Sequence, residues 1–93
     1  MGDFQVVSQV IRVANPTGFD VKPAGSLCKE AMKFKCQITY RYNETDVANA
    51  KSVLSVLGSI VRYGDEIELI CDGEDEEAAL VHLIAYLEAG LED

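Results

Sequence analysis

Apolar and polar residues alternate along several short segments of the chain, and a period of two predicts strands with one buried face. The clearest case is segment 36–42, where every second residue is apolar: Cys36, Ile38, Tyr40 and Tyr42. Segment 66–71 alternates in the same way, and segment 4–13 is rich in valine and isoleucine. A fourth and weaker strand is predicted at 45–49, after a short turn.

Helical spacing separates the predicted strands. Within 20–31, apolar residues recur at intervals of three and four, and Asp20 suits the N-cap position before the first turn. A short helix is predicted at 51–57, with Ser52 at its start. A third helix is predicted at 74–87, where an acidic first turn complements the helix dipole. Its expected apolar face consists of Leu80, Leu83, Ile84 and Leu87.

The resulting order, β-α-β-β-α-β-α, predicts an α+β fold, in which a four-stranded antiparallel sheet carries three helices on one face. The length of 93 residues suits one domain, so residues 1–93 are expected to form a single unit. A hydrophobic fraction of 48% agrees with a folded core rather than with disorder.

The charge of the chain argues against some classes of partner. Eight basic residues stand against sixteen acidic ones, which gives a net charge of −8. Nucleic acids and anionic membranes would be repelled by such a chain, so neither is an expected partner. No apolar run is long enough to span a bilayer and no signal-peptide pattern opens the sequence, so a cytoplasmic location is expected.

Few residues offer metal, redox or acid–base chemistry. Cys28, Cys36 and Cys71 form no C-x-x-C pair and fall on apolar stripes, so three buried free thiols are expected. The one histidine, His82, is expected to point into solvent, because two residues turn a helix by about 200° and so separate it from Leu80. No metal site, cofactor or histidine-based catalysis is therefore predicted.

Asp20 and Ser52 each allow two interpretations from the residues alone. Either side chain can act simply as an N-cap, which stabilises a helix by about 1 kcal/mol. Asp20 could instead be a nucleophile, with Lys22 as the group close in sequence that would neutralise a phosphate. Ser52 could instead accept a phosphate, which the dipole and the free amides of a helix start would favour.

Three separated segments resemble the HPr family, the histidine-containing phosphocarriers of the bacterial sugar phosphotransferase system. They are NPTGFDVKPAGSLCKEAMKF (15–34), NAKSVLSVL (49–57) and YGDEIELICDGEDEEAAL (63–80). The chain is even more similar to the HPr-like regulators that have lost the histidine. The resemblance implies the same element order, arranged as an open-faced β-sandwich, and a protein that is not an enzyme.

The phosphocarrier motif of this family, G-[LIF]-H-x-R-P-A, corresponds here to GFDVKPA at 18–24. The resemblance places Asp20 at the position of the phosphohistidine, Lys22 at that of the arginine and Pro23 at that of the proline. A carboxylate repels an incoming phosphoryl donor, and lysine lacks the bidentate fork of arginine. The resemblance therefore implies a site that keeps its scaffold and has lost its histidine carrier chemistry.

Ser52 corresponds to the family's regulatory serine, which a dedicated kinase/phosphorylase modifies in some bacteria. Val53, Leu54 and Leu57 correspond to an exposed apolar patch that docks this kinase and transcriptional partners. The alternative is that these three side chains belong to the core, and for Leu54 the sequence favours neither interpretation.

These observations favour a regulatory or adaptor protein related to the phosphoenolpyruvate-dependent sugar phosphotransferase system, controlled by phosphorylation at Ser52 and acting in carbon-catabolite regulation. Its expected partners are an HPr-type serine kinase/phosphorylase and a transcriptional regulator or metabolic enzyme. The expected contacts are Asp20, Lys22, Val53, Leu54 and Leu57. The chain is expected to be a monomer or weak dimer. Two alternatives remain open: a phosphoryl carrier that forms an acyl phosphate on Asp20, and a stand-alone module whose partner belongs to another pathway.

Overall fold

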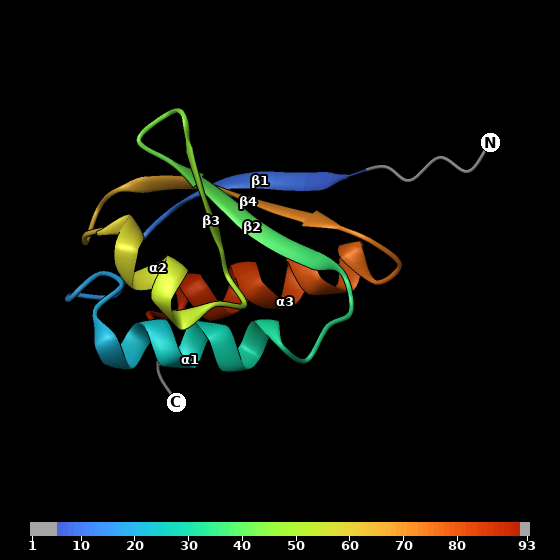
Figure 1. Ribbon diagram of the computed structural model, residues 1–93, viewed down its shortest axis with the longest axis horizontal. Helices are drawn as coiled ribbons and strands as arrows, with labels where there is room; N and C mark the ends of the chain where they lie inside the picture. Colours follow the sequence, from blue (N-terminus) through green and yellow to red (C-terminus); the bar gives the residue numbers. More distant parts are fainter. Residues whose placement is uncertain (1–5, 92–93) are drawn as a thin grey trace.

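The computed structural model describes residues 6–91, and its elements follow the predicted β-α-β-β-α-β-α order (Figure 1). The strands are β1 (Val7–Arg12), β2 (Gln37–Tyr42), β3 (Asp46–Asn49) and β4 (Glu66–Asp72). The helices are α1 (Val21–Ala31), α2 (Val53–Ser59) and α3 (Glu76–Glu88). None of these helices, within residues 6–91, combines the length and the apolar character needed to cross a membrane.

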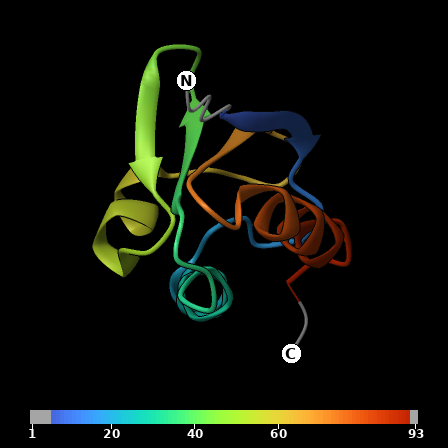
Figure 2. The ribbon, with the colours of Figure 1, turned by 90° about the vertical axis from the view of Figure 1, so that its right-hand side faces the viewer.

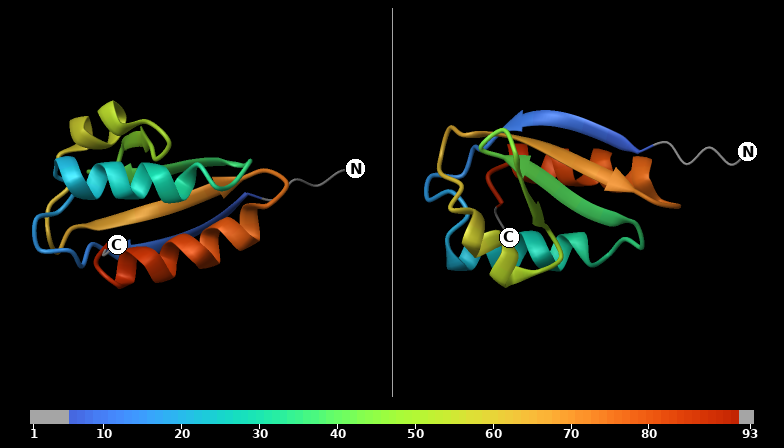
Figure 3. Two further views of the ribbon diagram at one scale, coloured as in Figure 1. Left: turned by 90° about the horizontal axis from the view of Figure 1, so that it is seen from below. Right: turned by 45° about the horizontal axis from the view of Figure 1, so that its top comes forward.

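The four strands form a sheet in the order β1-β4-β2-β3, and every neighbouring pair is antiparallel. The three helices lie on the same side of this sheet, which Figures 2 and 3 show from an end and from below. The opposite face carries polar strand residues, such as Glu68 of β4 beside Arg41 of β2, whose side chains form an ion pair of 2.6 Å. The prediction of an open-faced β-sandwich is confirmed.

The strand boundaries differ from the predicted ones by a few residues. Of the predicted strand 4–13, residues 7–12 are in β1, whereas residues 4 and 5 lie outside the described part of the chain. The alternation within β2 is confirmed, because Ile38 and Tyr40 are buried under the helices. The predicted period of two thus identified the buried face of this central strand correctly.

Burial along α3 differs from the predicted face. Leu83 and Leu87 are fully buried as predicted, but Leu80 and Ile84 are half-buried and pack at the margin of the core. Ala79 is buried instead. The predicted face included only large apolar side chains. The small side chain of Ala79 instead lets this helix lie against β1 and β4.

The acidic run before α3 connects this helix to β2. The carboxylate of Asp75 accepts hydrogen bonds from the backbone amides of Lys35 and Cys36 (2.8 and 2.9 Å). These bonds, with that from Lys35 as the largest contribution, hold the pKa of Asp75 below its ordinary value. Because the backbone of Asp75 is not helical (φ −106°, ψ 29°), the helix begins at Glu76 rather than at the predicted position 74.

The three cysteines are free, but they are not equally buried. Cys36 and Cys71 lie in the core, and burial raises the pKa of Cys36 to about 11 and that of Cys71 to about 12. Cys28 is half-buried, which corrects the prediction of three buried thiols. Its Sγ donates a hydrogen bond to the carbonyl oxygen of Lys51, in the chain before α2 (3.1 Å).

Candidate functional site

The loop before α1 is built around Gly18. This residue has a φ of +65°, and a Cβ there would collide with the carbonyl oxygen of Val61 and would lie 2.7 Å from the Cα of Arg62. The amide of Phe19 donates to the same carbonyl oxygen of Val61 (2.9 Å). The buried Asn15 donates through Nδ2 to the carbonyl oxygen of Gly18. The loop is therefore fixed against the segment that follows α2.

Asp20 is the N-cap residue of α1, as predicted. Its backbone is extended, and its Oδ1 accepts a hydrogen bond from the amide of Val21 (2.8 Å). Lys22 and Pro23 follow in the first turn, where a proline is tolerated because an amide there would have no partner within the helix. Asp20 and Lys22 are both exposed, so a partner molecule can reach their charged groups.

The carboxylate of Asp20 has no cation to neutralise it among residues 6–91. The ion pairs formed by the described residues do not include one between Asp20 and Lys22. A carboxylate that attacks a phosphoryl group must overcome the repulsion between two anions, which requires a neighbouring positive charge. The geometry of Asp20 is that of a helix cap.

Ser52 is the N-cap residue of α2. Its Oγ accepts a hydrogen bond from the amide of Ser55 (3.2 Å), and its carbonyl oxygen accepts one from the amide of Val56 (3.0 Å). Because its backbone is extended, the helix begins at Val53 and not at the predicted Lys51. The hydroxyl group is thus held at the amino end of the helix, toward which the first amides point.

The other two serines of α2 are placed differently. The Oγ of Ser55 accepts a hydrogen bond from the amide of Asn49, at the end of β3 (2.9 Å). Ser59 is buried, and its Oγ lies 2.8 Å from the hydroxyl oxygen of Tyr40. Burial also raises the pKa of Tyr40 to about 12. The hydroxyl group of Ser59 therefore belongs to the core.

The apolar residues of α2 divide between the surface and the core. Leu54 is 82% exposed, and Val53 is exposed to a smaller extent. Leu57 is half-buried and packs against the core, while Val56 is fully buried. Of the two interpretations that the sequence left open for Leu54, the structure selects the surface position.

The helices that carry Asp20 and Ser52 are neighbours in space (Figures 1 and 3). The hydrogen bond from the Sγ of Cys28 to the chain before α2 joins α1 to that helix. Beyond the other end of α2, Val61 holds the loop that precedes α1. Two positions that are widely separated in the sequence are thereby brought to adjacent helices.

The spacing of apolar residues does not mark Ile60, the residue that ends α2. Ile60 has a φ of 52° and a ψ of 46°, the left-handed conformation in which glycine or asparagine is usual at a helix end. Its side chain is 67% exposed. The helix has a glycine, Gly58, but this residue precedes the end instead of following it. A helix end without a terminal glycine is the one sequence signal that could have directed attention to Ile60.

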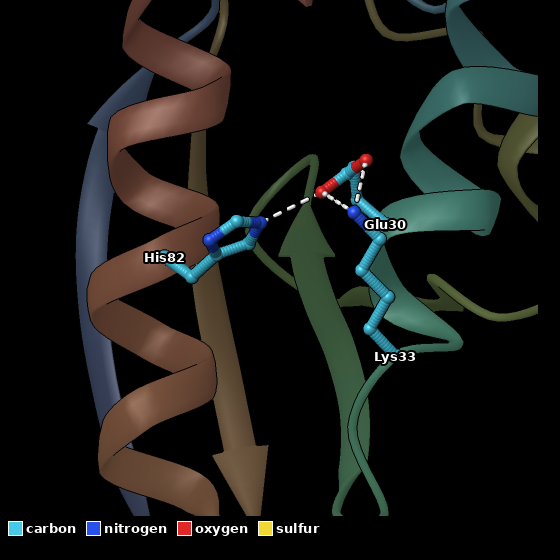
Figure 4. A network of polar contacts seen from close by, with 3 residues as sticks. All are labelled: Glu30, Lys33 and His82. Carbon is cyan, nitrogen blue, oxygen red and sulfur yellow. Dashed lines mark hydrogen bonds and ion pairs between the residues drawn. The ribbon is translucent and has the colours of Figure 1, made fainter.

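The lone histidine lies between α3 and α1, in a network of polar contacts (Figure 4). His82 is exposed as predicted, but its Nε2 lies 2.7 Å from Oε1 of Glu30, so it is not free in solvent. Lys33 forms an ion pair with the same carboxylate (3.0 Å), and the ring of Phe34 packs against the imidazole at 5.4 Å between centroids. The bond from His82 is the main cause that lowers the pKa of Glu30.

This network connects two helices, and its geometry is not that of a metal site. Across residues 6–91, no group of three or more histidine, cysteine, aspartate or glutamate side chains is arranged to hold a metal ion. His82 lies on α3, whereas Asp20 lies in the loop before α1.

Comparison with known proteins identifies the family. Residues 7–89 match the family model described as the PTS HPr component phosphorylation site. The chain belongs to the HPr family. Among its relatives, the HPr-like protein Crh of Bacillus subtilis is 35% identical over 83 residues, which cover 89% of this chain and 96% of Crh. The phosphocarrier protein HPr of Mycoplasma genitalium is 34% identical over 88 residues, or 95% of this chain and 94% of that protein.

Solved structures of HPr-family proteins have the same fold. The phosphocarrier protein HPr of Bacillus anthracis superposes with a TM-score of 0.83 at 28% identity, covering 88% of this chain and 96% of that chain. A crystal structure of Crh from Bacillus subtilis, described as a dimer with a swapped domain, gives 0.73 at 32% identity and covers 94% and 99%. The chain is thus an HPr-like protein of the phosphotransferase system family.

Proposed function

We propose that this HPr-family chain is a regulatory adaptor that does not carry phosphate on a histidine and that is controlled by phosphorylation of Ser52. The observation that carries the proposal is the start of α2, where the capping hydroxyl of Ser52 lies next in the chain to Val53 and the largely exposed Leu54. Exposed apolar side chains beside a modifiable hydroxyl suit a protein partner. Similarity to Crh, called a catabolite repression HPr, supports a role in carbon-catabolite regulation.

Phosphorylation of Ser52 is expected to change the surface and to leave the fold intact. A phosphate adds about −1.5 to −2 charges, and the amino end of a helix favours negative charge. The amide of Ser55, which donates a hydrogen bond to the hydroxyl oxygen of Ser52, remains available to donate one to a phosphate oxygen. The modification therefore acts outward, and a partner with an apolar recess flanked by arginine or lysine can bind the phosphate and Leu54 together.

The position of the family's phosphohistidine supports an adaptor better than a carrier. Asp20 is occupied as the cap of α1, and among the described residues it has no ion pair that would offset the repulsion of a phosphoryl donor. The alternative, an acyl phosphate on Asp20, lacks that support. Asp20 and Lys22 are exposed, and we assign them to partner contacts.

Two incubations test this proposal and separate it from the acyl-phosphate alternative. The wild-type, Asp20→Asn and Ser52→Ala chains are incubated with phosphoenolpyruvate and the general phosphotransfer enzyme, and separately with ATP and an HPr-type serine kinase. Native mass spectrometry at neutral pH preserves acid-labile phosphates. We expect one added phosphoryl group in the kinase incubation alone, and its loss in Ser52→Ala.

The two remaining outcomes have distinct meanings. An adduct formed with phosphoenolpyruvate and lost in Asp20→Asn would establish the carrier alternative. A wild-type chain that an active serine kinase leaves unmodified would refute regulation through Ser52.

A further inference from the structure

Ile60 ends α2 in a backbone conformation that is unfavourable for its side chain. Its φ of 52° and ψ of 46° lie in the left-handed region, and its amide donates to the carbonyl oxygen of Leu57 (3.3 Å). A β-branched residue is an outlier in this region, because its Cβ approaches the following carbonyl oxygen. Glycine would end the helix in the same way without this strain. The conformational preference of the backbone therefore favours glycine over isoleucine at this position.

Burial of the side chain does not explain the isoleucine either. Two-thirds of Ile60 is exposed (67%), whereas its neighbours in the sequence, Ser59 and Val61, are both buried. An exposed apolar residue is ordinary by itself. An exposed apolar residue held in a strained conformation indicates that the side chain has a use outside the fold.

The position of Ile60 connects two parts of the proposed partner surface. It directly follows the helix that carries Leu54. It directly precedes Val61, whose carbonyl oxygen holds the amide of Phe19 in the loop before Asp20 (2.9 Å). Ile60 also lines two surface hollows, of about 460 and 470 Å³, that adjoin one another.

These two hollows are acidic. Their lining contains two arginines and five carboxylates, namely Glu44, Asp46, Asp65, Glu66 and Glu68. Glu66 is paired with Arg12 and Glu68 with Arg41. The ion pairs of residues 6–91 include neither the lining residue Arg62 nor the three other carboxylates, which leaves an excess of negative charge. A group that packs on Ile60 therefore meets an apolar side chain with negative charge around it. Lysine and arginine side chains, with an apolar stem and a charged end, fit such a surface.

We propose that Ile60 is a specificity-determining residue of the partner surface, and that the partner presents an apolar recess edged by lysine or arginine. The inference rests on the proposed function and names the chemistry of its partner. The side chain of Ile60 fills the recess of the partner, and this contact accounts for an isoleucine at the helix end. Glycine there would relax the backbone and would remove the contact.

The test measures stability and phosphorylation of Ser52 on the same set of full-length chains. Ile60→Gly is expected to raise the midpoint of thermal unfolding by roughly 4 °C or more, because it removes the strain. The same substitution is expected to raise the KM of an HPr-type serine kinase roughly tenfold or more, with little change in kcat. Ile60→Leu keeps a large apolar side chain and should retain a KM within about twofold of wild type. Val81→Ala, at an exposed apolar position on α3, serves as the control and should change neither quantity.

A gain in thermal stability together with weaker binding of the kinase, both caused by Ile60→Gly, distinguishes a binding role of Ile60 from a structural one. If Ile60 served the fold alone, Ile60→Gly would lower stability or leave KM at the wild-type value, and either result would overturn the inference while Ser52 was still modified. If the kinase failed to modify the wild-type chain, the proposed function would be refuted, and the inference with it.

Discussion

Replacement of Leu54 by alanine separates the free energy of folding from the free energy of partner binding. Complete burial of a leucine side chain contributes about 1.5–3 kcal/mol. Because Leu54 is 82% exposed, roughly a fifth of that contribution is present in the free protein. Leu54→Ala should therefore lower the free energy of unfolding by roughly 0.3–0.5 kcal/mol, and the higher helix propensity of alanine offsets part of this loss.

The contribution of Leu54 to binding is expected to be several times larger. A partner that covers the exposed part of the side chain gains about 1.2–2.5 kcal/mol, which corresponds to roughly a seven- to sixtyfold change in affinity. Val56 provides the matched control, because it belongs to the same helix and is fully buried. Val56→Ala leaves a cavity and should cost about 2 kcal/mol or more in stability, without a comparable effect on the KM of the folded protein.

Denaturant unfolding and kinase kinetics, measured on both variants, show whether Leu54 contributes to partner binding or to folding. The expected result is a large increase in KM for Leu54→Ala with almost unchanged stability, and the reverse for Val56→Ala. A loss of more than about 1 kcal/mol in Leu54→Ala would show that this side chain supports the core. An unchanged KM in that variant would show that the docking surface lies elsewhere.

Single-residue contacts and burial are expected to set the stability or reactivity of three further positions, Asp20, Cys28 and Glu30. Asp20→Ala should lower the free energy of unfolding by about 0.5–1 kcal/mol in denaturant melts and Asp20→Asn by less, since Asp20 caps a single amide; no loss in the alanine variant would contradict the cap. At pH 7–8, a thiol reagent should modify Cys28 first, because burial raises the pKa of Cys36 to about 11 and that of Cys71 to about 12; equal rates for the native protein would contradict this. The pKa of Glu30 is lowered from 4.5, so its contribution to stability is present above that pH and is lost as the pH falls through the folded-state pKa. In Glu30→Gln, the free energy of unfolding should therefore decrease less between neutral and acid pH than in the wild type. Curves of stability against pH that run parallel for the two proteins would contradict this expectation.

The elements could be predicted where the pattern of residues repeats over a whole segment. In β2, apolar side chains alternate from end to end, and Ile38 and Tyr40 are buried as this pattern requires. Helix starts were harder to place, because a capping residue lies outside the helix it caps. The extended backbone of Ser52 moves the first helical residue of α2 to Val53.

The features that the sequence could not supply depend on tertiary contacts. Helical periodicity places His82 on the exposed side of α3, but it does not say that α1 brings Glu30 to within 2.7 Å of the imidazole. The same limit applies to Ile60, whose left-handed conformation is imposed where α2 ends and the chain turns to meet the loop of Phe19. Periodicity describes one element, whereas these contacts join two.

The location of the phosphate after treatment with an HPr-type serine kinase tests the proposed regulation most directly. Peptide mass spectrometry can distinguish the three serines of this region: Ser52, Ser55 and Ser59. We expect the phosphate on Ser52, a half-buried residue whose hydroxyl lies at the amino end of α2, since Ser59 is buried against Tyr40. Phosphate on Ser55 or Ser59, or a chain that an active kinase leaves unmodified, would contradict control through Ser52.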